Sequence, residues 1–227
     1  MSQKAEILFE NEKVIVIYKP AGLPVQTAYA SREDVCSQLK NHLKGGYLGV
    51  IHRLDQPVEG LVVFAKTGEA AAKLGRELAG EEMGKIYLAE VFGHALCGSG
   101  QLTAHVKKAA SGNISVIVPE KDPAAKEARL EYEVVAEHEK TSLVKIKLGT
   151  GRHHQIRLQL SDAGAPILGD RKYADEETKR YSEEQGIKEI RLCACRLKFV
   201  HPATLQKIDL KIAPVWCFTY PGVSDRL

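Results

Sequence analysis

The feature that most constrains the fold is a series of strand-like segments that follow one another directly. Alternating or β-branched stretches lie at 85–93, 101–106, 113–119, 126–138 and 141–149. Strands in direct succession are typical of antiparallel sheets, whereas parallel sheets need helices between their strands. With helices elsewhere in the chain, this pattern predicts an α+β fold with a largely antiparallel, mixed sheet.

The rest of the chain adds strands and helices on both sides of this series. Further strands are expected at 13–20, 61–67, 190–202 and 205–214. Helices are expected at 31–46 and 68–80, a loop entering a helix at 151–164, and a charged helix or loop at 174–189. Ser31 or Asp34 is the expected N-cap of the first helix, Gly45 and Gly46 its end, and Gly80 lies beyond the end of the second.

The composition is that of an ordinary globular protein. The 227 residues are 44% hydrophobic and 27% charged, and they contain no repeat or flexible linker, so one domain over 1–227 is expected. No apolar stretch is long enough to span a bilayer, and the N-terminus lacks the apolar region of a secretory signal. The five cysteines are an odd number, which favours free thiols in a reducing compartment, the cytoplasm.

The net charge and the sequence motifs exclude some classes of function but do not indicate one. A net charge of +3 and a pI near 8.5 are compatible with RNA binding but do not indicate it. The phosphate-binding fingerprints of nucleotide-cofactor enzymes and the nucleophile elbow of serine hydrolases are missing from the sequence. Cys193 and Cys195 have no second pair of ligands, and His153-His154 has no suitably spaced partner, so no metal site is predicted.

The segment HRLD, residues 52–55, is the first candidate site. A charged aspartate at the mouth of a hydrophobic strand is costly to desolvate unless it has a partner. The alternative is a surface loop in which Asp55 pairs with Arg53 or caps a turn.

The segment GRHHQIR, residues 151–157, is the second candidate site. Arg152, His153 and His154 would stand at the N-terminus of a helix, where the dipole disfavours cations unless an anion meets them. That anion is either a phosphate or a carboxylate from elsewhere in the chain. Arg157 follows His153 at helical spacing. A solvated helix start without a function is the alternative.

Tyr87, in the strand KIYLAEVFG, is the third candidate. Strand alternation places Tyr87 on one face with Lys85 and Ala89. Its phenol can transfer a proton in a dry cleft, but tyrosines on strands more often contribute to packing.

Taken together and in this order, the motifs resemble those of the RluA-type pseudouridine synthases. The matching stretches are YKPAGLPVQT, HRLDQPVEGLVVFAKT, KIYLAEVFG, GTGRHHQIRLQLSDAGAPILGDRKY and LCACRLKFVHP. They extend over about residues 13 to 213. The most specific are HRLD followed by Gly60, GRHHQIR and GDRKY.

The resemblance implies a pseudouridine synthase-like fold with a central active-site cleft. It also implies an isomerase that flips uridines out of tRNA or rRNA and converts them to pseudouridine without a metal or other cofactor. RNA is the partner it implies, with no membrane and no obligatory protein partner. We expect a stand-alone catalytic domain without the small RNA-binding module of the S4 type that some relatives carry.

The same resemblance assigns roles to individual residues. Asp55 would be the catalytic nucleophile toward the ribose or the base, and Arg157 would pair with it and keep it ionised in a closed cleft. Tyr87 would pack on the base and transfer a proton. Arg53 would take the place of the flipped base. The expected RNA-binding residues are His52, Arg53, Arg152 and His154.

Some positions depart from the family pattern. Val58 and Glu59 stand where a Thr followed by Ser or Ala is usual, Leu130 replaces a Thr, and Gln159 stands where His is frequent. Two other functions therefore stay open. One is a non-catalytic RNA-binding protein on the same scaffold, and the other is a glycosidase using the carboxylates of Asp55 and Glu59.

Overall fold

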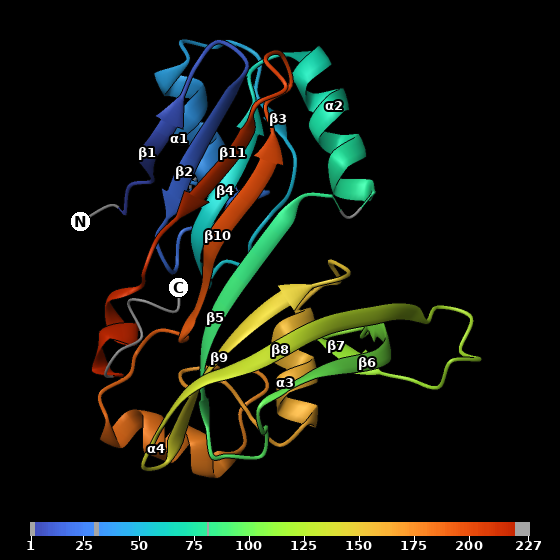
Figure 1. The fold of residues 1–227 in the computed structure, drawn as a ribbon, viewed down its shortest axis with the longest axis vertical. Helices are drawn as coiled ribbons and strands as arrows, with labels where there is room; N and C mark the ends of the chain where they lie inside the picture. The colour runs from blue at the N-terminus through green and yellow to red at the C-terminus, as the bar shows by residue number, and fades with distance from the viewer. Residues whose placement is uncertain (1–2, 30–31, 81, 221–227) are drawn as a thin grey trace. The chain divides into compact units, whose positions relative to one another are not determined.

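The computed structural model describes residues 3–29, 32–80 and 82–220 (Figure 1). The chain divides into two compact units. The first contains Met1–Lys85 and Cys193–Ile212, and the second contains Ile86–Leu192 and Ala213–Leu227. The chain therefore passes from one unit to the other three times.

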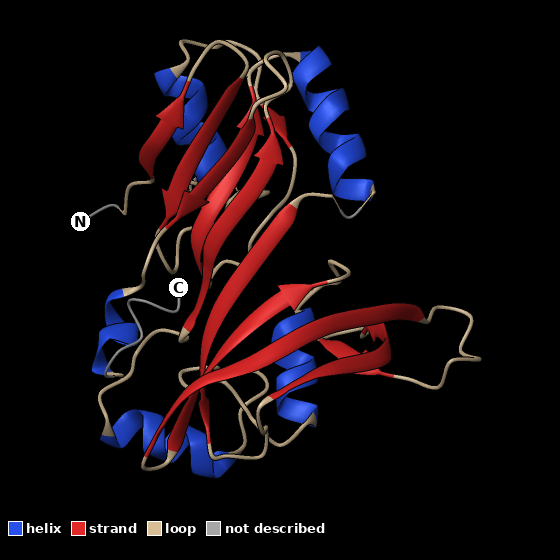
Figure 2. Cartoon of the chain, in the orientation of Figure 1, coloured by secondary structure: helices blue, strands red, loops and turns tan. Residues whose placement is uncertain are grey.

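The described residues of the first unit form a sheet and helices (Figure 2). Its strands are β1 (Glu6–Glu10), β2 (Val14–Lys19), β3 (Gly49–Val50), β4 (Glu59–Ala65), β10 (Leu192–Val200) and β11 (Lys207–Lys211). Its helices are α1 (Val35–His42) and α2 (Gly68–Ala79). β2 lies between β1 and β4, antiparallel to both, and β11 is antiparallel to β10. β10 is parallel to β4, which makes the sheet mixed.

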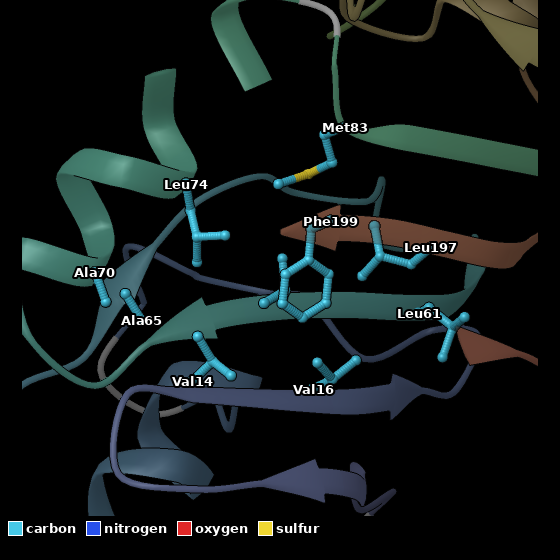
Figure 3. Packing of buried hydrophobic residues seen from close by; sticks show 10 residues of the cluster. Val14, Val16, Leu61, Ala65, Ala70, Leu74, Met83, Leu197 and Phe199 are labelled. Carbon is cyan, nitrogen blue, oxygen red and sulfur yellow. The ribbon is translucent and has the colours of Figure 1, made fainter. Parts of the chain in front are cut away.

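The core of the first unit lies where α2 packs against this sheet (Figure 3). Val14 and Val16 of β2 alternate toward α2, while Ile15 and Ile17 on the opposite face of the same strand are also fully buried. β2 therefore reads as an unbroken hydrophobic run, which is typical of a strand covered on both faces. The core residues are Val14, Val16, Leu61, Val63, Ala65, Ala70, Leu74, Met83, Leu197 and Phe199.

The helix ends follow from capping. The Asp34 carboxylate accepts from the N–H of Ser37 at 2.7 Å and of Thr27 at 2.8 Å, so Asp34 is the N-cap of α1. The alternative, Ser31, lies outside the described residues. Gly80 ends α2 as expected.

The second unit is built on an antiparallel sheet in the order β5-β9-β8-β6-β7. These strands are β5 (Gly84–Phe92), β6 (Ser99–Lys108), β7 (Ser115–Ile117), β8 (Lys126–His138) and β9 (Thr141–Leu148). The helices are α3 (Gln155–Asp162), α4 (Glu176–Glu184) and the 3₁₀ helix η1 (Val215–Thr219). α3 is fastened to the sheet by the amide of Gln159, which donates to the carbonyls of Leu102 and Ala128, each at 3.1 Å.

The predicted α+β class with a largely antiparallel sheet is confirmed. The charged segment 174–189 forms a helix, α4, with Asp175 as its N-cap. The sequence reasoning missed β1, β3 and η1. β1 is half polar and exposed along most of its length, β3 has only two residues, and a short 3₁₀ helix carries little periodic signal. Within the described part of the chain, no helix has the length and apolar character needed to cross a membrane.

Candidate active site

The HRLD loop of the first unit is anchored by a buried lysine. Lys19 ends β2 and is fully buried, and its ammonium group donates to the carbonyls of Pro20, Leu23 and Gln56 at 3.0, 2.8 and 3.0 Å. A buried cation is tolerated only when its donors are satisfied, and three carbonyl oxygens meet that demand. Because Gln56 follows Asp55, Lys19 fixes the backbone next to the predicted nucleophile.

A second set of contacts fixes the same loop. The Gly22 N–H donates to the Gln56 carbonyl at 2.9 Å, and the Gln56 side-chain amide donates back to the Gly22 carbonyl at 3.0 Å. The Val58 N–H donates to the carbonyl of Asp55 at 3.0 Å and closes a turn. Leu54 and Val58 are buried on either side of Asp55, which is half-buried itself. The loop therefore holds Asp55 in one backbone conformation.

His52 and Arg53 differ sharply in environment. The Val63 N–H donates to Nε2 of His52 at 3.3 Å, and burial, reinforced by the charge of Lys85, lowers the pKa of His52 to about 3. His52 is therefore neutral at physiological pH, so any contact it makes with RNA is not ionic. Arg53 is exposed and forms no ion pair with any residue that the structure describes, so the alternative Arg53–Asp55 pair is not formed.

The residues after the loop, Glu59 and Gly60, are fixed by neighbouring strands. The Tyr18 hydroxyl donates to the Glu59 carboxylate, and burial together with this carboxylate raises the pKa of Tyr18. Gly60 has a φ of +129°, and a Cβ there would lie 2.5 Å from both the backbone N and O of Ala194 in β10. Only glycine allows β10 to pair with β4 at this point, which explains the glycine after HRLD.

In the second unit, Arg157 forms a bidentate ion pair that the sequence reasoning did not predict. Its Nε and Nη2 donate to Oδ2 and Oδ1 of Asp170 at 2.7 and 2.6 Å. The two side chains are only 3% and 1% exposed. The anion that meets this cationic helix start is thus, for Arg157, a carboxylate from elsewhere in the chain.

The start of α3 carries less charge than its sequence suggests. His154 is its N-cap in a left-handed conformation, with φ of 54°. Burial, followed by the nearby charges of Arg157 and His153, lowers the pKa of His154 to about 3. Its Nδ1 lies 2.9 Å from the Tyr173 hydroxyl, and its ring stacks on His153 at 3.8 Å between centroids. A contact of His154 with RNA would therefore come from a neutral ring.

Arg152 and Tyr87 complete the predicted set. Arg152 is exposed and donates from Nε to the carbonyl of Glu127 at 2.8 Å. Tyr87 lies on β5 opposite Ile146 of β9 and is only 6% exposed. Lys85, at the start of β5, is half-buried, and this burial lowers its pKa.

The departures from the family pattern occupy structural positions. Val58 and Leu130 are buried, and Gln159 bonds α3 to two strands. The Glu59 carboxylate accepts a hydrogen bond from the Tyr18 hydroxyl. These substitutions therefore change packing rather than the groups predicted to do chemistry.

The predicted site residues belong to both units. Asp55, with Arg53 and His52, lies in the first, whereas Tyr87, Arg152, His154 and Arg157 lie in the second. The pairing of Asp55 with Arg157 stays a prediction. Sequence reasoning missed Lys19, Asp170 and Tyr173, although all three stand in the quoted stretches YKPAGLP and GDRKY, so a signal was present without a role attached.

No group of three or more His, Cys, Asp or Glu residues within the described ranges is arranged to hold a metal ion. All five cysteines are outside disulfides, and only Cys97 is exposed.

Comparison with known proteins gives one consistent result. The family described as RNA pseudouridylate synthase matches residues 13–162. The tRNA pseudouridine synthase C of Pasteurella multocida is 32% identical over 90% of this chain and 89% of its own length. The ribosomal large subunit pseudouridine synthase D of Zymomonas mobilis is 31% identical over 90% of this chain and 67% of its own.

Solved structures resemble the chain in fold. The human RNA pseudouridylate synthase domain containing 4 superposes with a TM-score of 0.74 at 24% identity, over 93% of this chain and 89% of that one. The human RNA pseudouridylate synthase domain containing 1 does so with a TM-score of 0.76 at 19% identity, over 93% and 84%.

Proposed function

The chain belongs to the RNA pseudouridylate synthase family, and from this premise we propose that it modifies specific uridines of tRNA or rRNA with Asp55 as its nucleophile. As a member of that family, it is an isomerase that converts uridine to pseudouridine in RNA. The reaction breaks the bond between N1 of uracil and C1′ of ribose, forms a bond from C5 to C1′, and moves the C5 hydrogen to N1. We take the two units as parts of one catalytic domain, because the chain passes between them three times.

Access to the uridine is the first step. A stacked base must be flipped out before its atoms can be reached, at a cost of a few kcal/mol that is smallest in loops and weakly paired sites. Arg53 is proposed to occupy the vacated position, where a planar guanidinium replaces part of the lost stacking. Its exposure and its lack of an ion pair with any described residue support this role.

Asp55 is the proposed nucleophile. An attacking carboxylate must remain ionised, yet desolvation in a closed cleft raises the pKa of a carboxyl group. A guanidinium beside it opposes that shift, and this is the proposed role of Arg157. The backbone on both sides of Asp55 is held by Lys19, Gly22 and Val58, so the carboxylate needs little reorganisation before reaction.

Tyr87 is the proposed base-stacking and proton-transfer group. Its burial on β5 suits an aromatic ring that packs against uracil in a dry site. RNA outside the reacting nucleotide would be held by the charged side chains of Arg53 and Arg152. His52 and His154, both neutral, would contribute shape and hydrogen bonds rather than charge.

The observation that carries this proposal is the fixed HRLD loop in a chain of this family. The test is pseudouridine mapping of cellular RNA from cells that lack the gene, complemented with wild type or with Asp55→Asn. We expect the missing pseudouridines to return only with wild type. Asp209→Asn, at a solvent-accessible site in β11, is the matched control and should restore them fully. Equal rescue by both Asp55 forms would remove Asp55 from the mechanism.

Two alternatives have their own signatures in the same experiment. A non-catalytic RNA-binding protein, suggested by Val58 and Glu59, would bind RNA equally well as Asp55→Asn, and no pseudouridine would depend on the gene. A glycosidase would release free uracil. The hydrogen bond from Tyr18 to Glu59 weighs against the glycosidase, because it engages the second carboxylate that this mechanism needs.

A further inference from the structure

We propose that Asp170 is a positioning residue for Arg157, which fixes the plane of the guanidinium group so that one of its edges faces a single direction. The inference rests on the proposed function, in which that edge meets the carboxylate of Asp55.

The geometry of the pair supports control of orientation as well as distance. Asp170 binds Arg157 side-on, through Nε at 2.7 Å and Nη2 at 2.6 Å. Two parallel bonds to a rigid planar fork define the plane of the group, which a single bond cannot do. The end-on edge, formed by Nη1 and the second hydrogen of Nη2, therefore has a fixed direction, away from Asp170.

Asp170 is itself held in place. Its Oδ1 also accepts from the N–H groups of Lys172 at 2.9 Å and Tyr173 at 3.3 Å. The preceding Gly169 has a φ of +74°, and a Cβ there would lie 2.3 Å from the carbonyl oxygen of Glu189. The turn can therefore form only with glycine at this position, which accounts for the GD of the GDRKY motif.

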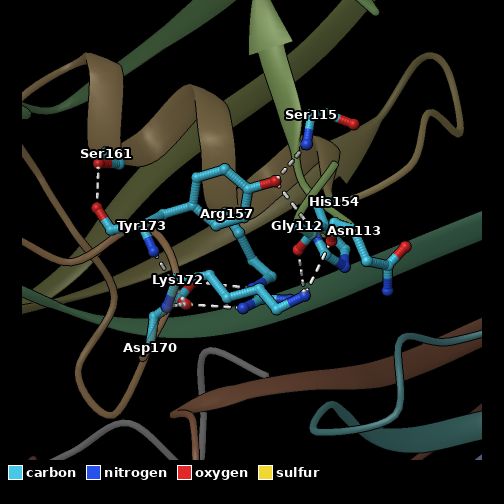
Figure 4. A network of polar contacts seen from close by, with 9 residues as sticks. All are labelled: Gly112, Asn113, Ser115, His154, Arg157, Ser161, Asp170, Lys172 and Tyr173. Atoms are coloured by element: carbon cyan, nitrogen blue, oxygen red, sulfur yellow. Dashed lines mark hydrogen bonds and ion pairs between the residues drawn. The ribbon is translucent and has the colours of Figure 1, made fainter. Parts of the chain in front are cut away.

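Tyr173 supports Arg157 from a second side (Figure 4). The Arg157 guanidinium carbon lies 5.2 Å from the centroid of the Tyr173 ring, within the range of a cation–π contact. The Tyr173 hydroxyl accepts from the Ser115 N–H at 2.7 Å, so its own hydrogen is available to Nδ1 of His154. The Asp170–Tyr173 turn thus restrains both the edge and the face of the guanidinium.

This arrangement predicts which properties of the enzyme should change when Asp170 is replaced. Arg157 keeps its charge without Asp170, but its guanidinium can rotate. The catalytic step should then slow and Asp55 should become easier to protonate, whereas RNA affinity, which depends on other side chains, should be unchanged. A purely structural Asp170 would lower stability and leave both the rate and the pH profile of the folded enzyme as they were.

The experiment compares Asp170→Asn with Asp209→Asn in steady-state assays on an RNA stem-loop that carries the mapped uridine. For Asp170→Asn we expect kcat to fall about 100-fold, with the half-saturating RNA concentration unchanged within about twofold. The acidic limb of its kcat profile should move to higher pH. The control loses an Arg–Asp pair of the same bond lengths and should change none of these quantities.

A second variant decides the question if Asp170→Asn does not fold. Tyr173→Leu removes the ring from the guanidinium and should lower kcat about three- to tenfold. Tyr173→Phe keeps the ring and should retain most of that rate. The inference is overturned if the folded Asp170→Asn enzyme, or Tyr173→Leu in its place, shows the wild-type kcat and pH profile.

Different variants test the positioning role of Asp170 and the proposed function of the enzyme. If Asp55→Asn is as active as wild type in the same assay, the proposed function fails. If Asp55→Asn is inactive while the Asp170 and Tyr173 variants behave as wild type, only the positioning role is lost.

Discussion

Among the residues that the structure describes, two bidentate Arg–Asp pairs have the same bond lengths but different surroundings. In the second unit, Arg157 binds Asp170 at 2.7 and 2.6 Å, and in the first, Arg196 binds Asp209 at the same two distances. Both pairs are separated by 13 residues in the sequence. The exposed fractions of the side chains are 3% and 1% in the second unit but 24% and 38% in the first.

Because the bond lengths are equal, we expect burial rather than bond geometry to set the energetic consequence of each ion pair. In water both charges are solvated, so their attraction adds little. In the interior each charge depends on the other, because neither is offset by solvent. The buried pair is therefore a poor source of net stability but an effective constraint on position, which fits a residue next to chemistry.

The largest difference between the two pairs should appear in the unfolding free energy when each aspartate is replaced by alanine. Asp170→Ala leaves a buried guanidinium without its partner and should cost about 3–5 kcal/mol of unfolding free energy. Asp209→Ala should cost only about 0.2–1 kcal/mol. Urea denaturation of both variants measures the two values. Equal losses would contradict the view that burial decides the difference.

A second comparison concerns pH, and it involves one histidine in each unit whose surroundings disfavour the charged form. The pKa of His154 and of His52 is lowered to about 3 in the fold, whereas an unfolded histidine titrates near about 6.5. Below the unfolded pKa, the unfolded chain binds a proton that the folded chain does not. Each histidine should therefore make stability fall as the pH decreases, by at most about 1.4 kcal/mol per pH unit.

His154→Asn isolates one of these contributions. Asparagine tolerates the left-handed conformation at position 154 and does not titrate. The variant should lose less stability than wild type between about pH 6 and pH 4, as measured by urea unfolding at a series of pH values. Parallel pH curves for the two proteins would show that the pKa of His154 is the same in the folded and the unfolded chain, against its burial beside Arg157.

Much of the fold could be predicted from local patterns. The segment 126–138 alternates and carries β-branched residues, and it coincides with β8. Asp34 was one of two candidate caps, with Ser31, because a short acceptor side chain precedes a helical segment. β1 could not be found in this way, since its pairing with β2 is a tertiary contact and its own residues are mostly exposed.

The candidate site was predictable only in part, for a related reason. Asp55, Tyr87 and Arg157 were proposed from motifs and stay predictions, whereas the desolvation that lowers the pKa of His52 and His154 is not visible in the sequence. Without that desolvation, both look like cations. Lys19 binds backbone carbonyl groups and Asp170 binds a guanidinium group, and folding brings these partners together. The sequence motifs contain Lys19 and Asp170 but do not indicate which groups they bind.

The smallest predicted effect on the unfolding free energy concerns the Arg196–Asp209 pair alone. The Arg196 hydrogen bond lowers the pKa of Asp209 below its ordinary value, so the pair's contribution is complete above the unfolded pKa and is lost as the pH falls through the folded pKa. The difference in unfolding free energy between wild type and Asp209→Asn should be about 0.2–1 kcal/mol near neutral pH. It should shrink as the pH falls below the ordinary carboxyl pKa of about 3.9, and it should also shrink in about 1 M salt. A difference that persists under both conditions would show that Asp209 stabilises β11 through hydrogen-bond geometry rather than charge, and the contrast with Asp170 would then need an explanation other than solvent screening.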